Sequence, residues 1–131
     1  MRIENRSEIR APVERVYDAL TDLDTLPRLI PDIQEAHVAH VRHGLVGTRL
    51  DLTTREGRHT QGEIKQCLPR RSLVLEDARG IREELNLHGR PDGRTELVEV
   101  LTLPDTLAAD GFEEEARTRF QQLVHDIEAG R

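Results

Sequence analysis

The first residues of the chain alternate between two kinds of side chain. Within residues 3–10, one face carries Ile3, Asn5, Ser7 and Ile9, and charged groups occupy the other face. A period of two is typical of a strand with one face buried. We therefore predict that residues 3–10 form the first strand.

A helical period replaces this alternation after Ala11. Pro12 stops the strand and suits the first turn of a helix, because its missing N–H would have no partner inside the helix there. The apolar positions that follow fall on one helical stripe: Val13, Val16, Tyr17 and Leu20. A second, short helix is predicted over residues 24–30, before Pro31 breaks it. Its apolar positions are Leu26, Leu29 and Ile30.

Between residues 33 and 104 the chain is divided into short segments by glycine and proline residues at hairpin distances. The predicted strands cover residues 33–41, 47–55, 59–68, 72–77, 81–88 and 94–103. Consecutive strands joined by short turns pair in the antiparallel sense. With the first strand, they predict a seven-stranded antiparallel meander.

The C-terminal region is predicted to form a long amphipathic helix. Asp110 and Glu113 have the spacing of a capping box at its start. The apolar stripe of this helix consists of Phe112, Ala116, Phe120, Leu123, Val124 and Ile127. Two i, i+4 ion pairs are expected on its solvent side, Glu113 with Arg117 and Glu115 with Arg119.

The order of these elements predicts an α+β fold. The apolar stripe of the last helix must be buried, and the sheet is its only predicted partner. A seven-stranded antiparallel sheet twists and curls, so a straight helix across its concave face leaves space beneath it. We therefore expect an internal apolar cavity between the helix and the sheet, of the kind that binds small molecules.

Several segments of the chain carry a resemblance to a known superfamily. Residues Ile9–Asp22, with Leu26-Pro27 and Ile30-Pro31 after them, look like the opening of the SRPBCC superfamily, which includes START domains and polyketide cyclase/dehydrases. Pro69–Leu75 and Gly93–Thr95 are similar to its characteristic turns. The resemblance spans essentially the whole chain and implies the helix-grip fold, a sheet wrapped around a long C-terminal helix, with a central cavity for a hydrophobic ligand. Members include cyclases, lipid or quinone carriers and protein-binding modules, so the fold does not decide among them.

Composition limits the function classes further. The 131 residues fit one domain, 1–131, and the net charge of -6 disfavours nucleic acid and anionic membranes as partners. We find no apolar run long enough for stable membrane insertion, and the N-terminus has no apolar stretch of a signal peptide, so a cytoplasmic location is expected. Cys67 is the single cysteine, which excludes an internal disulfide. No nucleotide motif is present, and no cofactor is predicted. An aromatic content of 2% favours a small, aliphatic cavity.

Two glutamates are candidates for chemistry inside the cavity. Glu99 shares a strand face with Leu97, Leu101 and Leu103, and Glu83 shares one with Leu85 and Leu87. If the leucine faces point at the helix, both carboxylates are buried, and desolvation brings their proton affinity into the range useful for general acid–base catalysis. In the alternatives, Val98 and Val100 point inward instead, or each glutamate pairs structurally with an arginine.

The predicted ligand contacts come from the last helix, two strands and the first helix. They are Phe112, Ala116, Phe120, Leu85, Leu97, Glu99, Leu101 and Tyr17. Tyr17 is more often a core residue at such a position, with its hydroxyl at the cavity rim. His37, His40 and His43 do not predict a metal site, because strand positions three apart face opposite sides.

Three functions remain open at this stage. The leading hypothesis is binding or transport of a small hydrophobic ligand, such as a lipid, quinone or polyketide-like molecule. The second is a cyclase/dehydrase-like enzyme that uses the cavity carboxylates. The third is a protein-interaction module, and an exposed apolar stripe could also serve as a homodimer seam.

Overall fold

The computed structural model describes residues 1–107 and 111–130, and its elements follow the predicted order. The strands are β1 (Arg2–Ile9), β2 (Ile33–His40), β3 (Arg49–Thr54), β4 (His59–Leu68), β5 (Ser72–Asp77), β6 (Arg82–Gly89) and β7 (Thr95–Thr102). Helix α1 (Val13–Leu20) and the 3-10 helix η1 (Leu26–Leu29) follow β1, and α2 (Phe112–Glu128) ends the described chain. Among the described residues, no helix is both long and apolar enough to span a lipid bilayer.

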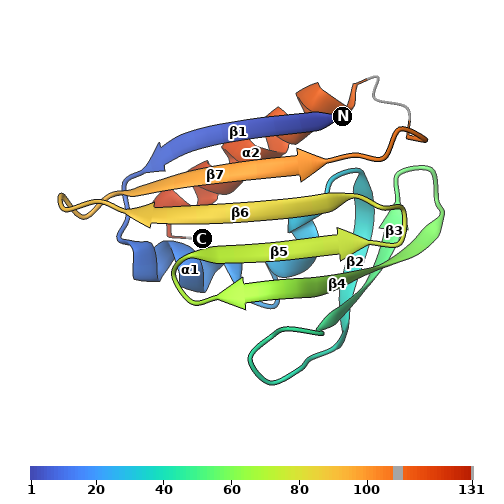
Figure 1. The fold of residues 1–131 in the computed structure, drawn as a ribbon, viewed down its shortest axis with the longest axis horizontal. Helices are drawn as coiled ribbons and strands as arrows, with labels where there is room; N and C mark the ends of the chain where they lie inside the picture. Colours follow the sequence, from blue (N-terminus) through green and yellow to red (C-terminus); the bar gives the residue numbers. More distant parts are fainter. Residues whose placement is uncertain (108–110, 131) are drawn as a thin grey trace.

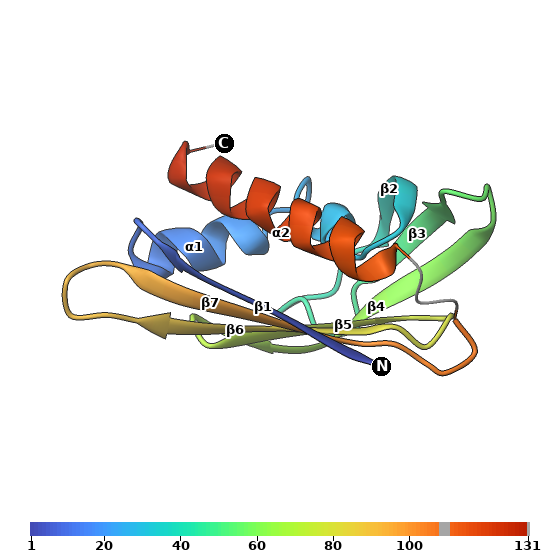
Figure 2. The same cartoon turned by 90° about the horizontal axis from the view of Figure 1, so that it is seen from above.

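The seven strands form one antiparallel sheet in the order β1-β7-β6-β5-β4-β3-β2 (Figure 1). Both helices lie on one face of this sheet, and the end formed by β2 and β3 turns up toward α2 (Figure 2). Register shifts interrupt the pairing of β2 with β3 and of β4 with β5. Irregular pairing of this kind bends a strand and increases its twist. The antiparallel sheet with a long helix across one face confirms the predicted helix-grip fold.

The core lies between α2 and the inner face of the sheet, as the periodicities predicted. One cluster contains Phe120 and Ile127 of α2, together with residues of α1, of η1 and of the middle strands. A second cluster joins Phe112 and Ala116 to Ile3, Leu101 and other residues at the opposite end. Full burial of a leucine or phenylalanine side chain stabilises a fold by about 1.5–3 kcal/mol. This packing fixes α2 over β1 and β7.

Local details differ from the predictions in three places. The N-cap of α2 is Gly111, in the left-handed region at φ 77°, and Asp110, the predicted cap, lies outside the described residues. The second helix is a single 3-10 turn, since η1 spans only Leu26–Leu29. Of the two predicted ion pairs on α2, Glu113 with Arg117 is present at 3.8 Å. Placing Arg119 on the solvent side was wrong, because its side chain is only 17% exposed and contacts two buried carboxylates.

Candidate functional site

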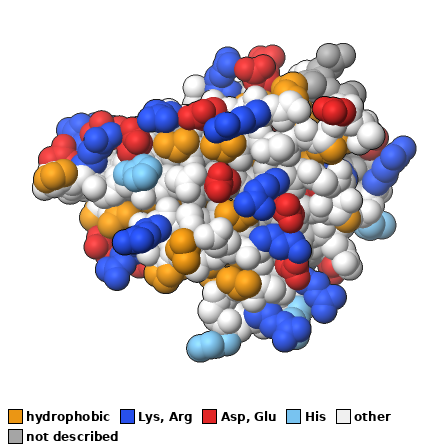
Figure 3. Space-filling view, in the orientation of Figure 1, with side chains coloured by type: hydrophobic (Ala, Val, Ile, Leu, Met, Phe, Trp, Pro, Cys, Tyr) orange, Lys and Arg blue, Asp and Glu red, His pale blue; other side chains and the backbone are white. Residues whose placement is uncertain are grey.

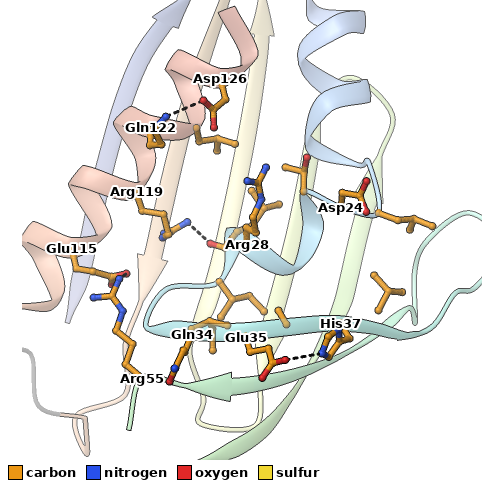
Figure 4. Close-up of a pocket in the computed structure, with 18 of the residues that line it drawn as sticks. Asp24, Arg28, Gln34, Glu35, His37, Arg55, Glu115, Arg119, Gln122 and Asp126 are labelled. Atoms are coloured by element: carbon orange, nitrogen blue, oxygen red, sulfur yellow. Dashed lines mark hydrogen bonds and ion pairs between the residues drawn. The ribbon is translucent and has the colours of Figure 1, made fainter. Parts of the chain in front are cut away.

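A groove of about 950 Å³ lies beside α2, where the helix faces η1 and β2. Figure 4 shows its walls, with Glu115, Arg119, Gln122 and Asp126 on α2 and Arg28 reaching across from η1. Small-molecule sites in proteins commonly enclose about 300–1,000 Å³. The groove is therefore large enough for a ligand, and it is larger and more polar than the small aliphatic cavity expected from composition.

Apolar and charged side chains share the lining. The apolar members are Leu23, Leu29, Ile30, Ile33, Ala36, Val38 and Leu123. The charged members and the single histidine are Asp24, Arg28, Glu35, His37, Arg55, Glu115, Arg119 and Asp126. A lining of this kind suits an amphipathic molecule, because the apolar part gains burial while its polar substituents keep hydrogen-bonding partners.

The β2 wall is held in place by a buried arginine. Arg79 donates to both Asp77, at 2.7 Å, and Asp32, at 3.1 Å, and its Nη2 also donates to the carbonyl of Pro31. The side chain of Asp77 is fully buried. Charge-assisted bonds of this type are stronger than neutral ones. They attach the start of β2 to the turn between β5 and β6, and so fix one side of the groove.

Two polar contacts lie along the rim of the groove. Arg55 contacts Glu115 at 3.3 Å, which links the end of β3 to α2. Glu115 also accepts a hydrogen bond from the backbone N–H of Asp32. Glu35 and His37, on the same strand, are 3.4 Å apart, and both are largely exposed (Figure 4). The rim is therefore charged on both sides and accessible to solvent.

Arg119 connects the groove to a buried pair of glutamates. Its Nη1 donates to the carbonyl of Leu29 at the end of η1 (Figure 4). Its Nη2 lies 3.4 Å from Oε2 of Glu83 and 3.4 Å from Oε2 of Glu99. Because Arg119 lines the groove and the two carboxylates do not, the guanidinium lies between them and any bound molecule.

Both glutamates lie on the inner face of the sheet, which settles the choice of face that the alternation of β6 and β7 left open. Glu99 pairs with Asn5 across β1 and with Leu85 across β6, and Glu83 pairs with Leu101. The exposed fraction is 0% for Glu99 and 1% for Glu83. Asn5 donates its side-chain N–H to Oε1 of Glu99 at 3.1 Å. The alternative in which Val98 and Val100 point inward is wrong, and the alternative of a structural arginine partner matches Arg119.

Burial sets the protonation of this cluster. It raises the pKa of Glu83 well above the ordinary value, the neighbouring Glu99 carboxylate raises it further, and Arg119 acts in the opposite direction. Burial alone would lower the pKa of Arg119, but the charges of Glu83 and Glu99 outweigh it, and the pKa is raised. The arginine is therefore charged, and Glu83 holds its proton to a higher pH than an exposed glutamate does.

Hydrogen-bonding capacity in the cluster is incompletely used. Among the described residues, the buried atoms Oε1 of Glu83 and Nε of Arg119 have no hydrogen-bond partner. Unpaired buried polar atoms are uncommon, since each costs about 1–3 kcal/mol. The two unpaired atoms differ in position, because Arg119 lines the groove and Glu83 lies behind it.

The predicted apolar ligand contacts occupy the core beside the groove. Phe112, Ala116 and Leu101 pack in one core cluster, and Leu85, Leu97 and Phe120 pack in the other. None of them is among the described residues that line the groove. Their role as ligand contacts stays a prediction. None of the residues that line the groove, on η1, β2, α2 and the segments beside them, was named as a site residue from the sequence.

Tyr17 makes a polar contact away from the groove. Its hydroxyl lies 3.0 Å from Sγ of Cys67, which is half-buried on β4. Burial and the hydrogen bond with Cys67 raise the pKa of Tyr17 to about 12. The hydroxyl is therefore protonated at neutral pH and does not act as a base there.

Comparison with known proteins identifies the same fold class. A family model described as polyketide cyclase / dehydrase and lipid transport matches residues 9–122. No curated protein matches the chain. Among solved structures, a protein of Deinococcus radiodurans is similar over 100% of both chains, with a TM-score of 0.73 and 18% identity.

Two further solved structures are similar at 18% identity each. An AHSA1-like protein from Aeromonas hydrophila has a TM-score of 0.71, and the match covers 99% of this chain and 94% of that protein. The Aha1 dimer from Colwellia psychrerythraea has a TM-score of 0.66, and the match covers 99% and 95%. Likeness at this level of identity establishes the fold and leaves the ligand open.

Proposed function

Because the chain belongs to the polyketide cyclase/dehydrase and lipid transport family, within the SRPBCC superfamily that its sequence resembles, we propose that it binds a small amphipathic ligand in the groove between α2, η1 and β2. The observation that carries this proposal is the volume of about 950 Å³ with apolar and charged walls. A lipid, quinone or polyketide-like molecule combines a large apolar body with few polar groups, and it suits this lining.

A substitution that fills the groove tests the proposal. Ala36 lines it from β2, and the chain contains no tryptophan. We expect Ala36→Trp to weaken binding of the amphipathic dye 8-anilinonaphthalene-1-sulfonate about tenfold or more, equivalent to about 1.4 kcal/mol, because the indole occupies ligand volume. Fluorescence titration measures the dissociation constant of the dye.

Ala39→Trp provides the matched control. Ala39 is on the same strand, is exposed, and is not among the residues that line the groove. It should leave dye affinity unchanged. Native mass spectrometry of purified wild-type protein, followed by lipid extraction, identifies any molecule carried from the cell. Equal dye affinity in both variants, with no molecule retained by wild type, would refute ligand binding in the groove and favour a protein-interaction role.

A second function is favoured by one observation, the buried pair Glu83 and Glu99 behind Arg119. A glutamate whose pKa is raised by burial is suited to general acid catalysis, and the pKa of Glu83 is shifted in that direction. An enzyme of this type needs Arg119 to move so that the acid reaches a bound molecule. If wild type converts a retained polyketide-like molecule, Glu83→Gln should abolish that conversion and preserve dye affinity. This result would distinguish catalysis from ligand binding alone.

A further inference from the structure

The turn between β2 and β3, residues 41–48, carries an unusual distribution of charge. The chain has 25 acidic residues among 131, yet none lies between Glu35 and Asp51. Arg42, in the turn, and Arg49, the first residue of β3, fall within this interval and are exposed. In an acidic protein, the tip of this hairpin is therefore locally basic.

The same turn exposes apolar side chains. Val41 is 50% exposed and Val46 is 49% exposed, and both belong to the small set of large apolar residues at the surface. Figure 1 shows the turn projecting beyond the sheet, and Figure 3 shows arginine and histidine side chains at the same lower end of the molecule. Apolar and basic groups are thus presented together.

Backbone hydrogen bonds define the shape of the turn and keep the valines outside. The N–H of Leu45 donates to the carbonyl of Arg42, and that of Thr48 donates to the carbonyl of Leu45. Leu45 adopts a left-handed conformation at φ 71° and packs against the core. A branched side chain takes this conformation only when the surrounding structure imposes it. Leu45 therefore occupies the inward position, and the valines stay exposed.

Two carboxylates lie close to Arg49, at the base of the turn. Glu63 on β4 is opposite Arg49 and also forms an ion pair with Lys65, and Asp51 is two residues further along β3. Arg42 and Arg49 both act electrostatically on Glu63. The turn itself, residues 41–48, contains Arg42 and no acidic residue, so its end remains positively charged.

The net charge of -6 repels an anionic surface from most of the molecule. We propose that the turn between β2 and β3, where the chain carries no carboxylate, nevertheless docks the protein on an anionic lipid surface. Arginines bind lipid phosphates, and valines enter the boundary between headgroups and acyl chains. A purely basic patch would suit any polyanion, whereas exposed valines beside the arginines add apolar burial that a bilayer interface provides. The docking does not depend on which molecule the groove binds, although it would bring the groove close to a source of amphipathic ligands.

Vesicle co-sedimentation of the full chain tests the docking. We expect wild type to bind vesicles of phosphatidylcholine mixed with phosphatidylglycerol more strongly than vesicles of phosphatidylcholine alone, and added salt to reduce the difference. Arg42→Gln should weaken binding to the anionic vesicles about fivefold, the contribution of one basic residue near such a surface. The double variant V41S/V46S should weaken it by a similar factor or more.

Matched controls use the same chemical changes elsewhere on the surface. Arg58→Gln removes an exposed arginine next to Glu56, and Leu68→Ser removes an apolar side chain that is 45% exposed. Both should bind anionic vesicles like wild type. Equal binding of wild type to both vesicle types, or equal loss in control and turn variants, would overturn the proposal. A smaller oligomeric mass of V41S/V46S in analytical ultracentrifugation, with vesicle binding unchanged, would also overturn it and assign the turn to a second copy of the chain.

These outcomes are separate from those that test the groove. The turn variants should leave affinity for 8-anilinonaphthalene-1-sulfonate unchanged, and Ala36→Trp should leave vesicle binding unchanged. Failure of vesicle binding with intact dye binding rejects the docking alone. Failure of dye binding with intact vesicle binding rejects the groove as the ligand site alone.

Discussion

Replacing Arg119 with methionine is expected to lower the free energy of unfolding by about 3–5 kcal/mol at neutral pH. The guanidinium contacts two carboxylates that are almost completely buried, and methionine keeps much of the arginine stem while removing the charge. A buried carboxylate that has lost its charged partner pays its desolvation cost without compensation. Urea unfolding followed by circular dichroism measures the change, and the melting temperature should fall by about 10 °C or more.

Arg117→Met is the matched control for this substitution. Arg117 lies two residues earlier on α2, is exposed, and contacts Glu113 at 3.8 Å. Exposed ion pairs contribute about 0–1 kcal/mol, so this variant should remain close to wild type. Equal unfolding free energies for Arg119→Met and Arg117→Met would contradict the buried position of Arg119.

A second substitution shows whether the lost stability comes from the carboxylates. In the double variant E99Q/R119M, a neutral amide replaces the buried Glu99 carboxyl group, and the unfolding free energy should recover part of the loss. Residues in one ion-pair network commonly show coupling of about 0.5–3 kcal/mol. Simple addition of the two single effects would mean that Arg119 acts through packing of its stem.

Much of the fold was predictable because two periodicities persist along the chain. The alternation in β6 and β7 grouped each glutamate with leucines on one strand face without deciding which face points inward, and in the structure both glutamates are buried on the inner face. The stripe of α2 predicted which side of the helix is buried, since Phe120, Val124 and Ile127 all lie in the core. These patterns are local, so each strand or helix reports its own buried face.

Arg119 was missed because a charged residue in a helix is ordinarily assigned to solvent. It follows Thr118 and precedes Phe120, at the edge of the apolar stripe. Two glutamates on leucine-rich strand faces were the available signal, because carboxylates buried with those leucines would require a cation or a proton. A basic residue next to the stripe of the covering helix was the natural partner.

The position of the groove could not be predicted from the same patterns. It depends on how β2 bends toward α2, and β2 contains register shifts between Ile33 and Glu35 and between Val38 and His40. It also depends on η1, whose carbonyl at Leu29 is bound by Arg119. Bulges and single 3-10 turns have no hydrophobic period of their own, so the hydrophobic pattern gives no signal for a groove beside the core stripe.

The free energy of unfolding of wild type is expected to fall as pH rises because of Glu83, and replacing Glu83 with glutamine should abolish this part of the fall. The pKa of Glu83 is raised above its ordinary value of 4.5, by burial first and by Glu99 second. The folded protein therefore binds this proton more tightly than the unfolded chain. The stability that the proton contributes is fully present below the pKa of the unfolded chain, and it is lost as pH rises through the raised pKa of the folded protein. The slope for one proton is at most about 1.4 kcal/mol per pH unit.

Urea unfolding of wild type, Glu83→Gln and Glu84→Gln across about pH 5 to 8 measures this contribution. Glu84 is the next residue on β6 and lies on the outer face, so its variant should run parallel to wild type. The difference in unfolding free energy between Glu83→Gln and wild type should grow with pH. The contributions of the carboxylates that both proteins share cancel in this difference. Parallel curves would mean that Glu83 titrates alike in the folded and unfolded chains. Such a result would mean that burial does not hold a proton on Glu83, so acid catalysis by this cluster would lack its physical basis. It would not affect the proposal that the groove binds a ligand.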